Sequence, residues 1–335
     1  MRAYQMPSSA MPHFIRLSGN MIASAARGNG RLCILTYHRI LDAHDFSLVK
    51  MDVETFRWQM QLLADCFNVL PLHEALQMLL LKQIPPRAVC ITFDDGYRST
   101  YDLALPILKE FGLPATVFTT TAHMDGGNMW NDRIIEAVRL LPNGPLDLRE
   151  LGLDLHPIVD ARNRIEIAAK LNDHAKYLLP SERTNVIDTL EKLAGELAGK
   201  PVAPNLMLNR EMIASLSQNG MEIGGHTVTH PILSKLDDAS ARSEILENKQ
   251  VLERIIGKSL RLFAYPNGKV GVDYDERHVR MVEEAGYTAA FTTAIGSASQ
   301  FNDIYQMPRS RPWDATPFMF GLRLLRWLAD RDTAS

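Results

Sequence analysis

Two short segments, more than a hundred residues apart, carry the side chains in this sequence that could do chemistry: Thr92-Phe93-Asp94-Asp95-Gly96-Tyr97 and His226-Thr227-Val228-Thr229-His230. Catalytic metal sites commonly take three protein ligands from His, Asp or Glu and leave one position open. Two histidines and one aspartate complete that set, so the second aspartate is surplus. A surplus carboxylate beside such a site can act as a general base, which is an arrangement suited to hydrolysis.

The residues around both segments favour one shared site. Adjacent side chains of an extended strand point in opposite directions, so one aspartate can face the metal while the other faces the attacking water. Histidines four residues apart converge on one ion if the segment makes a helical turn, and Gly224-Gly225 before them allows close approach of the backbone. Asp-Gly is also a common turn signal, and a lone histidine can be a hydrogen-bonded loop residue. The two segments together favour the metal site over these structural explanations.

These residues resemble the motifs of the polysaccharide deacetylase family, the NodB-homology domains of carbohydrate esterase family four. Thr92 to Tyr97 is similar to the first motif of the family, and His226 to Pro231 is similar to the second. Phe263 to Gly268 is similar to a third motif, and Leu35 to Arg39 to an N-terminal element of one branch. The resemblance implies a metal-dependent hydrolase that removes an N-acetyl group from an amino sugar of a polysaccharide or glycan precursor.

The resemblance also implies roles for the residues of the first two motifs. Asp95, His226 and His230 are expected to hold a divalent ion, and Asp94 is expected to be the general base. We expect zinc, with cobalt and nickel as alternatives, because one carboxylate and two imidazoles suit several divalent ions. The expected partner is an N-acetylated amino-sugar glycan.

The third motif supplies the expected substrate contacts and is one place where the sequence departs from the family. By resemblance, Tyr265, Pro266 and Asn267 bind substrate, and the backbone N–H of Asn267 stabilises the oxyanion. Many relatives carry an arginine where this chain has Ala264. We expect the last strand to supply an arginine that orients the base instead. The two candidates are Arg309 and Arg311, and Arg309 is also predicted to bind substrate. An exposed basic pair is the structural alternative.

The general acid is the second departure from the family. Many relatives carry this acid as a histidine in a C-terminal motif, but the last histidine of this chain is His278, on a predicted helix. His38, at the end of the first predicted strand, is therefore expected to protonate the departing amine. A structural strand-end histidine is the alternative, and Asp94 returning its proton is the other route to the same step.

Apolar runs of strand length alternate along the chain with helical periodicities, which predicts parallel β/α units. The strands are expected at 32–37, 88–93, 115–120, 221–224, 262–265 and 289–292. The helices are expected at 53–66, 72–81, 98–110, 210–218, 239–256 and 276–285. Periodicity alone leaves a barrel and an open sheet as alternatives, and the resemblance implies a distorted (β/α)7 barrel. The three motifs follow strand ends, so they are expected on one face of it.

The chain divides into four predicted parts. Residues 1–31 are expected to be an N-terminal helical extension, and residues 32–320 the barrel. A helical insertion of about 121–205 interrupts the barrel between its third and fourth strands, with one helix beginning near Trp130 and another running from Ser181 toward Leu197. Residues 321–335 are expected to be a C-terminal helix and tail.

Composition excludes several classes of protein. The net charge of −3 over 335 residues supplies no long-range field to hold nucleic acid. The three cysteines lack a Cys-x-x-Cys spacing and are expected to be buried free thiols. No signal-peptide pattern and no spanning apolar run is present, so a cytoplasmic location is expected. A short amphipathic helix at Phe14–Ala26 is expected to dock on the domain, with peripheral contact to the inner membrane as the alternative.

Two other functions fit the same residues. The same metal and base would serve an amidohydrolase that acts on a small, non-polymeric amide. The departures at the acid and arginine positions also suit a catalytically degenerate, glycan-binding component of a polysaccharide assembly system.

Overall fold

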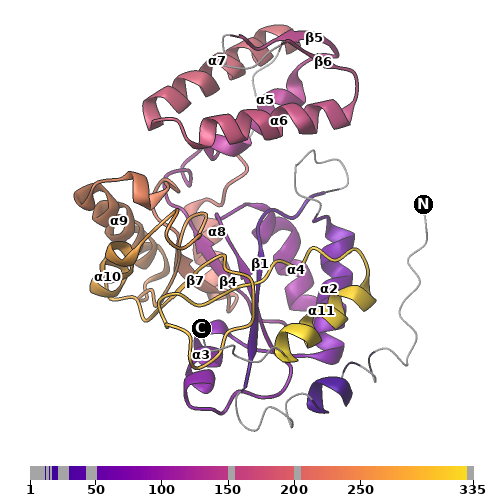
Figure 1. Ribbon diagram of the computed structural model, residues 1–335, viewed down its shortest axis with the longest axis vertical. Coiled ribbons are helices and arrows are strands. Elements are labelled where there is room, and N and C mark those ends of the chain that lie inside the picture. The colour runs from indigo at the N-terminus through magenta and orange to yellow at the C-terminus, as the bar shows by residue number, and fades with distance from the viewer. Residues whose placement is uncertain are drawn as a thin grey trace. The chain divides into compact units, whose positions relative to one another are not determined.

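The computed structural model describes residues 12, 15, 17–21, 30–42, 51–149, 155–199 and 205–329. The chain forms two compact units, shown in Figure 1. The first comprises Met1–Ile40, Met51–Asp125 and Leu208–Ser335, and the second comprises Leu41–Lys50 and Gly126–Met207. Of the helix predicted at Phe14–Ala26, Ile15 and residues 17–21 are described and are helical, and the rest lies outside the described residues.

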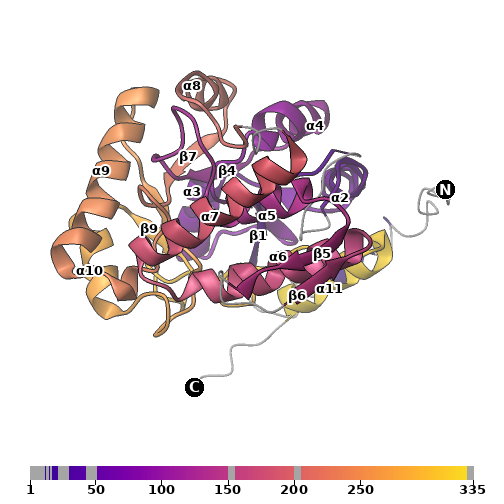
Figure 2. The same ribbon diagram turned by 90° about the horizontal axis from the view of Figure 1, so that it is seen from above.

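A curled, parallel sheet forms the centre of the first unit (Figure 2). Its strands follow the order β1-β3-β4-β7-β8-β9, and β2 pairs with β3. Parallel bridges join Leu35 to Ser310 and Phe291 to Met307, so the segment 307–310 lies between the last strand and the first. This arrangement confirms the predicted distorted (β/α)7 barrel. The strands are β1 (Leu32–Tyr37), β2 (Asn68–Val69), β3 (Ala88–Phe93), β4 (Thr116–Thr119), β7 (Glu222–Gly225), β8 (Leu262–Ala264) and β9 (Ala289–Phe291).

The central strands β1 and β3 explain where the first motif begins. Every residue of both strands is buried, as near-continuous apolar runs predict for a sheet covered on both faces. Tyr37 pairs with Phe93 in register, so the two strands end at the same level. The N–H of Asp94 then donates to the carbonyl of Tyr37 at 2.9 Å. Asp94 therefore stands at the carboxyl end of the sheet.

The helices of the first unit begin and end at sequence signals. Asp52 caps α2 and Asn209 caps α8, each through a side-chain oxygen that accepts a backbone N–H of the first turn. Gly112 and Gly257 end α4 and α9 in the left-handed conformation. The predicted helix at 98–110 instead begins as the π-helical turn Thr100–Ala104. The helices are α2 (Val53–Cys66), α3 (Leu72–Leu80), α4 (Leu105–Phe111), α8 (Arg210–Gln218), α9 (Asp238–Ile256), α10 (Glu276–Glu284) and α11 (Pro317–Ala329).

Alternate residues of the strands pack into two apolar layers. Cys33 and Leu35 of β1 belong to the larger cluster, which includes buried residues of α2, α4 and α9. Leu32 and Ile34 belong to a second cluster with Phe118. This alternation follows from the two-residue period of a strand. The three cysteines are free and buried, as predicted.

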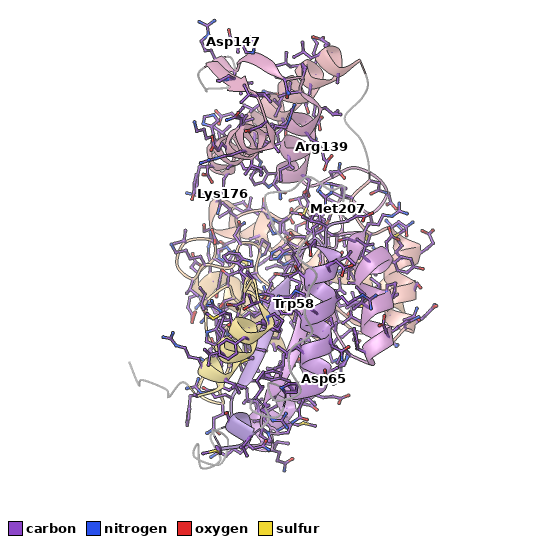
Figure 3. The ribbon with its side chains drawn as sticks, turned by 90° about the vertical axis from the view of Figure 1, so that its right-hand side faces the viewer. Trp58, Asp65, Arg139, Asp147, Lys176 and Met207 are labelled. Atoms are coloured by element: carbon purple, nitrogen blue, oxygen red, sulfur yellow. The ribbon has the colours of Figure 1, made fainter. Side chains whose placement is uncertain are left out.

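The second unit has an apolar core of its own. Its elements are α5 (Trp130–Leu140), β5 (Gly144–Asp147), β6 (Leu155–Ile158), α6 (Ala161–Lys176) and α7 (Pro180–Ala198). Ile134, Leu171 and Leu190 are fully buried in this core. The partly exposed Arg139 forms an ion pair with the buried Glu136 at 2.7 Å, and Figure 3 labels Arg139 and Asp147. The antiparallel pair β5–β6 and helix α6 add to the two helices that the sequence predicted here.

None of the described helices is long and apolar enough to cross a membrane.

Candidate metal centre

Asp95, His226 and His230 converge at the carboxyl ends of the strands. Oδ1 of Asp95 lies 3.3 Å from Nε2 of His226 and 3.4 Å from Nε2 of His230. One ligand atom from each of the three lies within 4.8 Å of the others. Asp95 and His226 are buried, whereas His230 is partly exposed. The structure thus brings together the three residues that the two motifs nominated.

The two aspartates diverge because of a turn. Asp95 has a φ of 74° and Gly96 a φ of 85°, so the chain leaves the extended conformation directly after Asp94. A Cβ atom on Gly96 would lie 2.1 Å from Oγ1 of Thr119, which leaves room for glycine alone. The carbonyl of Asp95 accepts from N–H and Oγ1 of Thr120, at 3.3 and 3.0 Å. A left-handed turn, in place of the predicted extended strand, therefore sends the two carboxylates in different directions.

The histidine segment is also left-handed where the spacing predicted a helical turn. Thr227 has a φ of 65° and His230 a φ of 58°. Such values are uncommon for residues with a side chain and cost free energy unless the surroundings hold them. The N–H of His230 donates to Oγ1 of Thr227 at 3.2 Å, which closes the segment on itself. The two rings meet with their centroids 4.9 Å apart.

Two polar side chains of α9 hold this segment, and sequence reasoning missed both. Glu244 accepts from the N–H groups of Val228 and Thr229, at 2.8 and 2.9 Å, and from Oγ1 of Thr229 at 2.6 Å. Asn248 is fully buried; its Oδ1 accepts from the N–H of His226 at 3.1 Å. Its Nδ2 donates to the carbonyl of Thr227 at 2.6 Å. A polar residue on the apolar side of a predicted helix is the signal that could have identified Asn248, because buried polar groups require partners.

The hydrogen bonds of His226 fit it to hold a metal ion. Its Nδ1 lies 2.7 Å from the carbonyl oxygen of Ala264, an acceptor, so Nδ1 carries a proton. In the neutral ring, Nε2 then presents a lone pair to the carboxylate of Asp95. Nε2 of His226 and Oδ1 of Asp95 would then be two acceptors 3.3 Å apart, an arrangement that is stable only with a cation or a proton between them. A backbone carbonyl that fixes the tautomer of a ligating histidine is typical of metal sites, so the donor set fits a divalent ion.

Burial and charge act against each other on these three groups. Burial alone would raise the pKa of Asp95, but its hydrogen bond with His226 and the charge of His230 hold that pKa well below its usual range. Burial alone would lower the pKa of His226, but the hydrogen bond that its ring donates to Asp95, together with the charges of Asp94 and Asp95, outweighs burial and raises that pKa. Burial lowers the pKa of His230 to about 4, against a smaller opposing effect of Asp95. His230 therefore offers a neutral ring at neutral pH.

Asp94 is paired inside the barrel with Arg309. The two guanidinium nitrogens Nη1 and Nη2 donate to Oδ1 and Oδ2 of Asp94, each at 2.7 Å. Nε of Arg309 donates to the carbonyl of Thr292 at 3.1 Å, and the side chain is almost fully buried. Burial would raise the pKa of Asp94, but the Arg309 guanidinium outweighs it and holds that pKa below its usual range. Of the two arginines proposed to orient the base, Arg309 is the one that contacts it, and this use of its donors replaces the predicted contact with substrate.

The third motif is more deeply buried than predicted. The ring of Tyr265 is fully buried and stacks on Tyr274 with centroids 3.8 Å apart, so it does not reach a substrate at the surface. Pro266 is also buried. Asn267 is partly exposed, has a φ of 57°, and its carbonyl accepts from Oγ1 of Thr293 at 2.7 Å. Asn267 thus remains available for a substrate, and the prediction for the Tyr265 side chain is corrected.

His38 lies near the site, and His278 has a different role. His38 is partly exposed, and its charge lowers the pKa of Asp94, of Asp95 and of His230. His278 is fully buried at the start of α10, with Nε2 lying 3.1 Å from the carbonyl of Leu233. The role of His38 as the general acid therefore stays a prediction.

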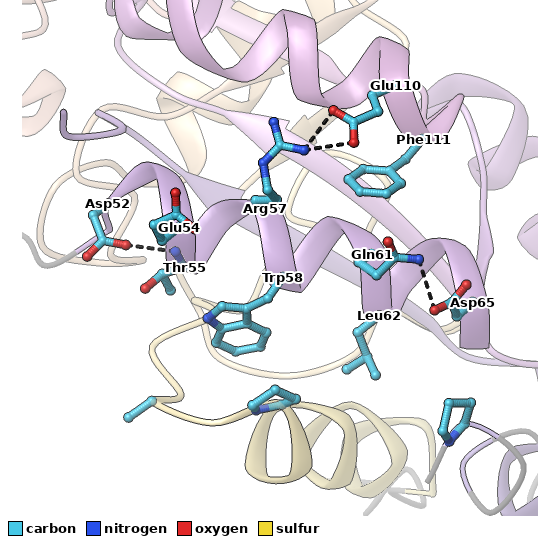
Figure 4. A pocket seen from close by; sticks show the side chains of 13 residues that line it. Asp52, Glu54, Thr55, Arg57, Trp58, Gln61, Leu62, Asp65, Glu110 and Phe111 are labelled. Carbon is cyan, nitrogen blue, oxygen red and sulfur yellow. Dashed lines mark hydrogen bonds and ion pairs between the residues drawn. The ribbon is translucent and has the colours of Figure 1, made fainter. Parts of the chain in front are cut away.

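A pocket of about 600 Å³ on the outside of the barrel contains none of the predicted site residues. Figure 4 shows its lining, with Trp58 and Phe111 beside the ion pair of Arg57 and Glu110. That ion pair is exposed and measures 2.7 Å. The titratable groups that could do chemistry lie at the metal centre rather than in this pocket.

A model of the family described as polysaccharide deacetylase matches residues 82–290. The chain is 23% identical over 283 residues to YxkH of Bacillus subtilis, a protein classed by its name with the polysaccharide deacetylases; the match covers 84% of this chain and 71% of that protein. It is 26% identical over 175 residues to the poly-β-1,6-N-acetyl-D-glucosamine N-deacetylase of Staphylococcus epidermidis, covering 51% of this chain and 59% of that enzyme.

Among solved structures, the fold is similar to that of the Streptococcus pyogenes deacetylase PplD in complex with acetate. The TM-score is 0.58 at 20% sequence identity, and the match covers 90% of this chain and 99% of the other. At this identity the likeness concerns the fold alone.

Proposed function

Because this chain belongs to the polysaccharide deacetylase family, we propose that it removes N-acetyl groups from β-linked N-acetylglucosamine residues of a polysaccharide. The family consists of divalent-metal-dependent hydrolases that cleave the amide bond of N-acetyl amino sugars. Zinc is the metal that we propose, held by Asp95, His226 and His230. The observation that carries the proposal is a buried, arginine-paired carboxylate, Asp94, directly beside three convergent ligand atoms. The activity named for the staphylococcal relative supports the choice of substrate.

When bound, a divalent ion polarises the amide carbonyl and makes a water molecule more acidic. Asp94 is the proposed base that accepts a proton from the attacking water. The paired guanidinium of Arg309 keeps Asp94 ionised and fixes its orientation, because both carboxylate oxygens are bound. This pairing gives Arg309 a positioning role, since its side chain is almost fully buried.

Two other groups of the chain serve the later steps. The backbone N–H of Asn267 is the proposed donor to the oxyanion, a role that does not depend on the side chain. His38 is the proposed acid that protonates the departing amine, because it follows β1 at the level where Asp94 follows β3. A His38→Gln variant is expected to lower kcat while leaving metal binding unchanged.

The test is acetate release from β-1,6- and β-1,4-linked N-acetylglucosamine oligomers by the full chain loaded with zinc, cobalt or nickel. We expect release that a chelator abolishes and added metal restores. The Asp94→Asn variant is expected to bind metal and oligomer without releasing acetate. Asp102→Asn, at an exposed ion pair with Arg98, is the matched control and should release acetate like the parent. A metal-loaded parent that binds the oligomers but releases no acetate would contradict the proposal and favour the glycan-binding alternative.

A further inference from the structure

An arginine and a tryptophan project outward directly after the strand segment that closes the barrel. Trp313 is 69% exposed, and the guanidinium carbon of Arg311 lies 5.0 Å from the centre of the Trp313 ring. The preceding segment runs parallel to β1 and β9. Residues 311–313 therefore follow its carboxyl end, at the face of the barrel where Asp94 and Asp95 follow β3.

Buried hydrogen bonds hold the backbone that carries Arg311 and Trp313. Ser310 exchanges backbone hydrogen bonds with β1, donating to Ile34 at 2.8 Å and accepting from Thr36 at 2.9 Å. The carbonyl of Pro312 accepts from Nε2 of Gln59 at 3.0 Å. Gln59 is fully buried, and its Oε1 accepts from the hydroxyl of Tyr37 at 2.6 Å. The backbone that displays Arg311 and Trp313 is thus held in place without a ligand.

Arg311 has no carboxylate partner among the ion pairs of the described residues. Burial lowers the pKa of Arg311 and the charge of Arg309 adds to this, whereas Asp94 and Asp95 act in the opposite direction. The two arginines therefore differ in their surroundings. Arg309 is paired with Asp94 inside the barrel, whereas Arg311 faces solvent at the same end of the sheet.

We propose that Arg311 and Trp313 form a subsite for the sugar next to the one that is deacetylated, and that this sugar carries an anionic group. The inference rests on the proposed function. The C–H face of a pyranose ring is apolar and can lie on the open face of the indole, which is a rigid contact surface with little entropy to lose. A guanidinium binds a carboxylate or a phosphate through charge-assisted hydrogen bonds. A uronic acid and a phosphorylated sugar share this chemistry.

The test compares acetate release from three oligomers of equal length: neutral N-acetylglucosamine, the same with a neighbouring glucuronate, and the same with a neighbouring sugar phosphate. We expect the parent to favour one of the anionic oligomers, and the better of the two identifies the source of the charge. Arg311→Gln should raise KM for that oligomer by about 10- to 100-fold, with kcat little changed, because one charge-assisted interaction is lost. Arg311→Lys should restore part of this affinity.

Trp313→Ala should raise KM for every oligomer but not for N-acetylglucosamine alone, which does not reach the subsite, and Trp313→Phe should restore part of the affinity. Equal use of neutral and anionic oligomers by the parent and by Arg311→Gln would overturn the inference. A fall in kcat of the Arg311→Gln variant for N-acetylglucosamine alone would also overturn the inference, because Arg311 would then act on the reacting groups. Calorimetry of oligomer binding to Asp94→Asn makes the same comparison without turnover. A failure of acetate release would contradict the proposed function, whereas the difference in binding between neutral and anionic oligomers would still test the subsite.

Discussion

The two sides of the metal centre are built in different ways. The base side consists of Asp94 and Arg309, which project from strand ends into the barrel and pair with each other. The ligand side places His230 in a left-handed conformation within a segment that Glu244 and Asn248 hold from α9. Sheet register fixes the first side, and hydrogen bonds from a remote helix fix the second. Removing one partner of the pair on the base side should therefore leave a buried, unpaired charge. Removing a support of the ligand side should instead lower the affinity for the metal.

The largest expected effect comes from removing the base. Asp94→Asn should lower kcat/KM by about 10²- to 10⁴-fold, because a general base supplies an acceleration of that order. The dissociation constant of the metal should change little, since Asp94 lies on the base side. Steady-state kinetics and calorimetric metal titration measure the two quantities on the same preparation. A loss of metal affinity as large as the loss of activity would place Asp94 among the ligands and break the comparison.

Removing only the arginine should destabilise the fold. Arg309→Gln leaves the carboxylate of Asp94 buried without its partner, and breaking such a pair costs about 3–5 kcal/mol. The double variant Asp94→Asn with Arg309→Gln should recover most of this free energy of unfolding, because both charges are then gone, but not the activity. Urea denaturation measures all three variants. Arg57→Gln, which breaks the exposed pair with Glu110, is the control and should cost less than about 1 kcal/mol.

The supports on α9 test the ligand side. Asn248→Ala and Glu244→Gln should each raise the dissociation constant of the metal by about 10- to 100-fold, as expected when groups that orient ligands are lost. At saturating metal, kcat should return close to the parent value. Glu247→Gln is the matched control, because Glu247 lies on the same helix and accepts a hydrogen bond from Oγ of Ser243 rather than from the ligand segment. A loss of kcat that metal does not restore would mean that α9 shapes the base side as well.

The smallest expected effect concerns His278, a buried histidine outside both sides. Burial lowers its pKa, against a smaller opposing effect of Asp275, so the folded state favours the neutral ring. The stability from this group is fully present above the unfolded pKa of about 6.5 and is lost as pH falls below it toward the folded pKa. The parent should lose more free energy of unfolding between neutral and mildly acidic pH than His278→Gln does. Identical pH profiles for His278→Gln and the parent would contradict the prediction.

Much of the base side could be predicted from the sequence, because apolar runs mark the ends of β1 and β3 and the motifs follow them. The choice between Arg309 and Arg311 could not be made, since the segment Met307–Ser310 lacks an apolar run that would set which residues face inward. Tyr265 ends the apolar run 262–265 and continues the inward packing of β8, so the run indicated its burial, whereas the resemblance to the third motif implied a substrate contact. The pair β5–β6 escaped because both strands are short and contain proline.

The ligand side was predicted only in its residue types. The Asp95-Gly96 pair is a turn signal, but the spacing alone does not show that Thr227 and His230 are left-handed. Their conformations depend on contacts with Thr120, Glu244 and Asn248, which adjoin them only in the folded chain. The spacing of the histidines therefore indicated the site correctly but gave the wrong local structure.

The central claim is that one divalent ion joins the two motifs on the ligand side while Asp94 stays paired with Arg309. An anomalous-difference map from a zinc-loaded crystal tests this most directly. The account predicts one peak at about 2.0–2.2 Å from a carboxylate oxygen of Asp95 and from Nε2 of both His226 and His230. A peak that Asp94 ligates, or zinc bound only elsewhere in the chain, would contradict it.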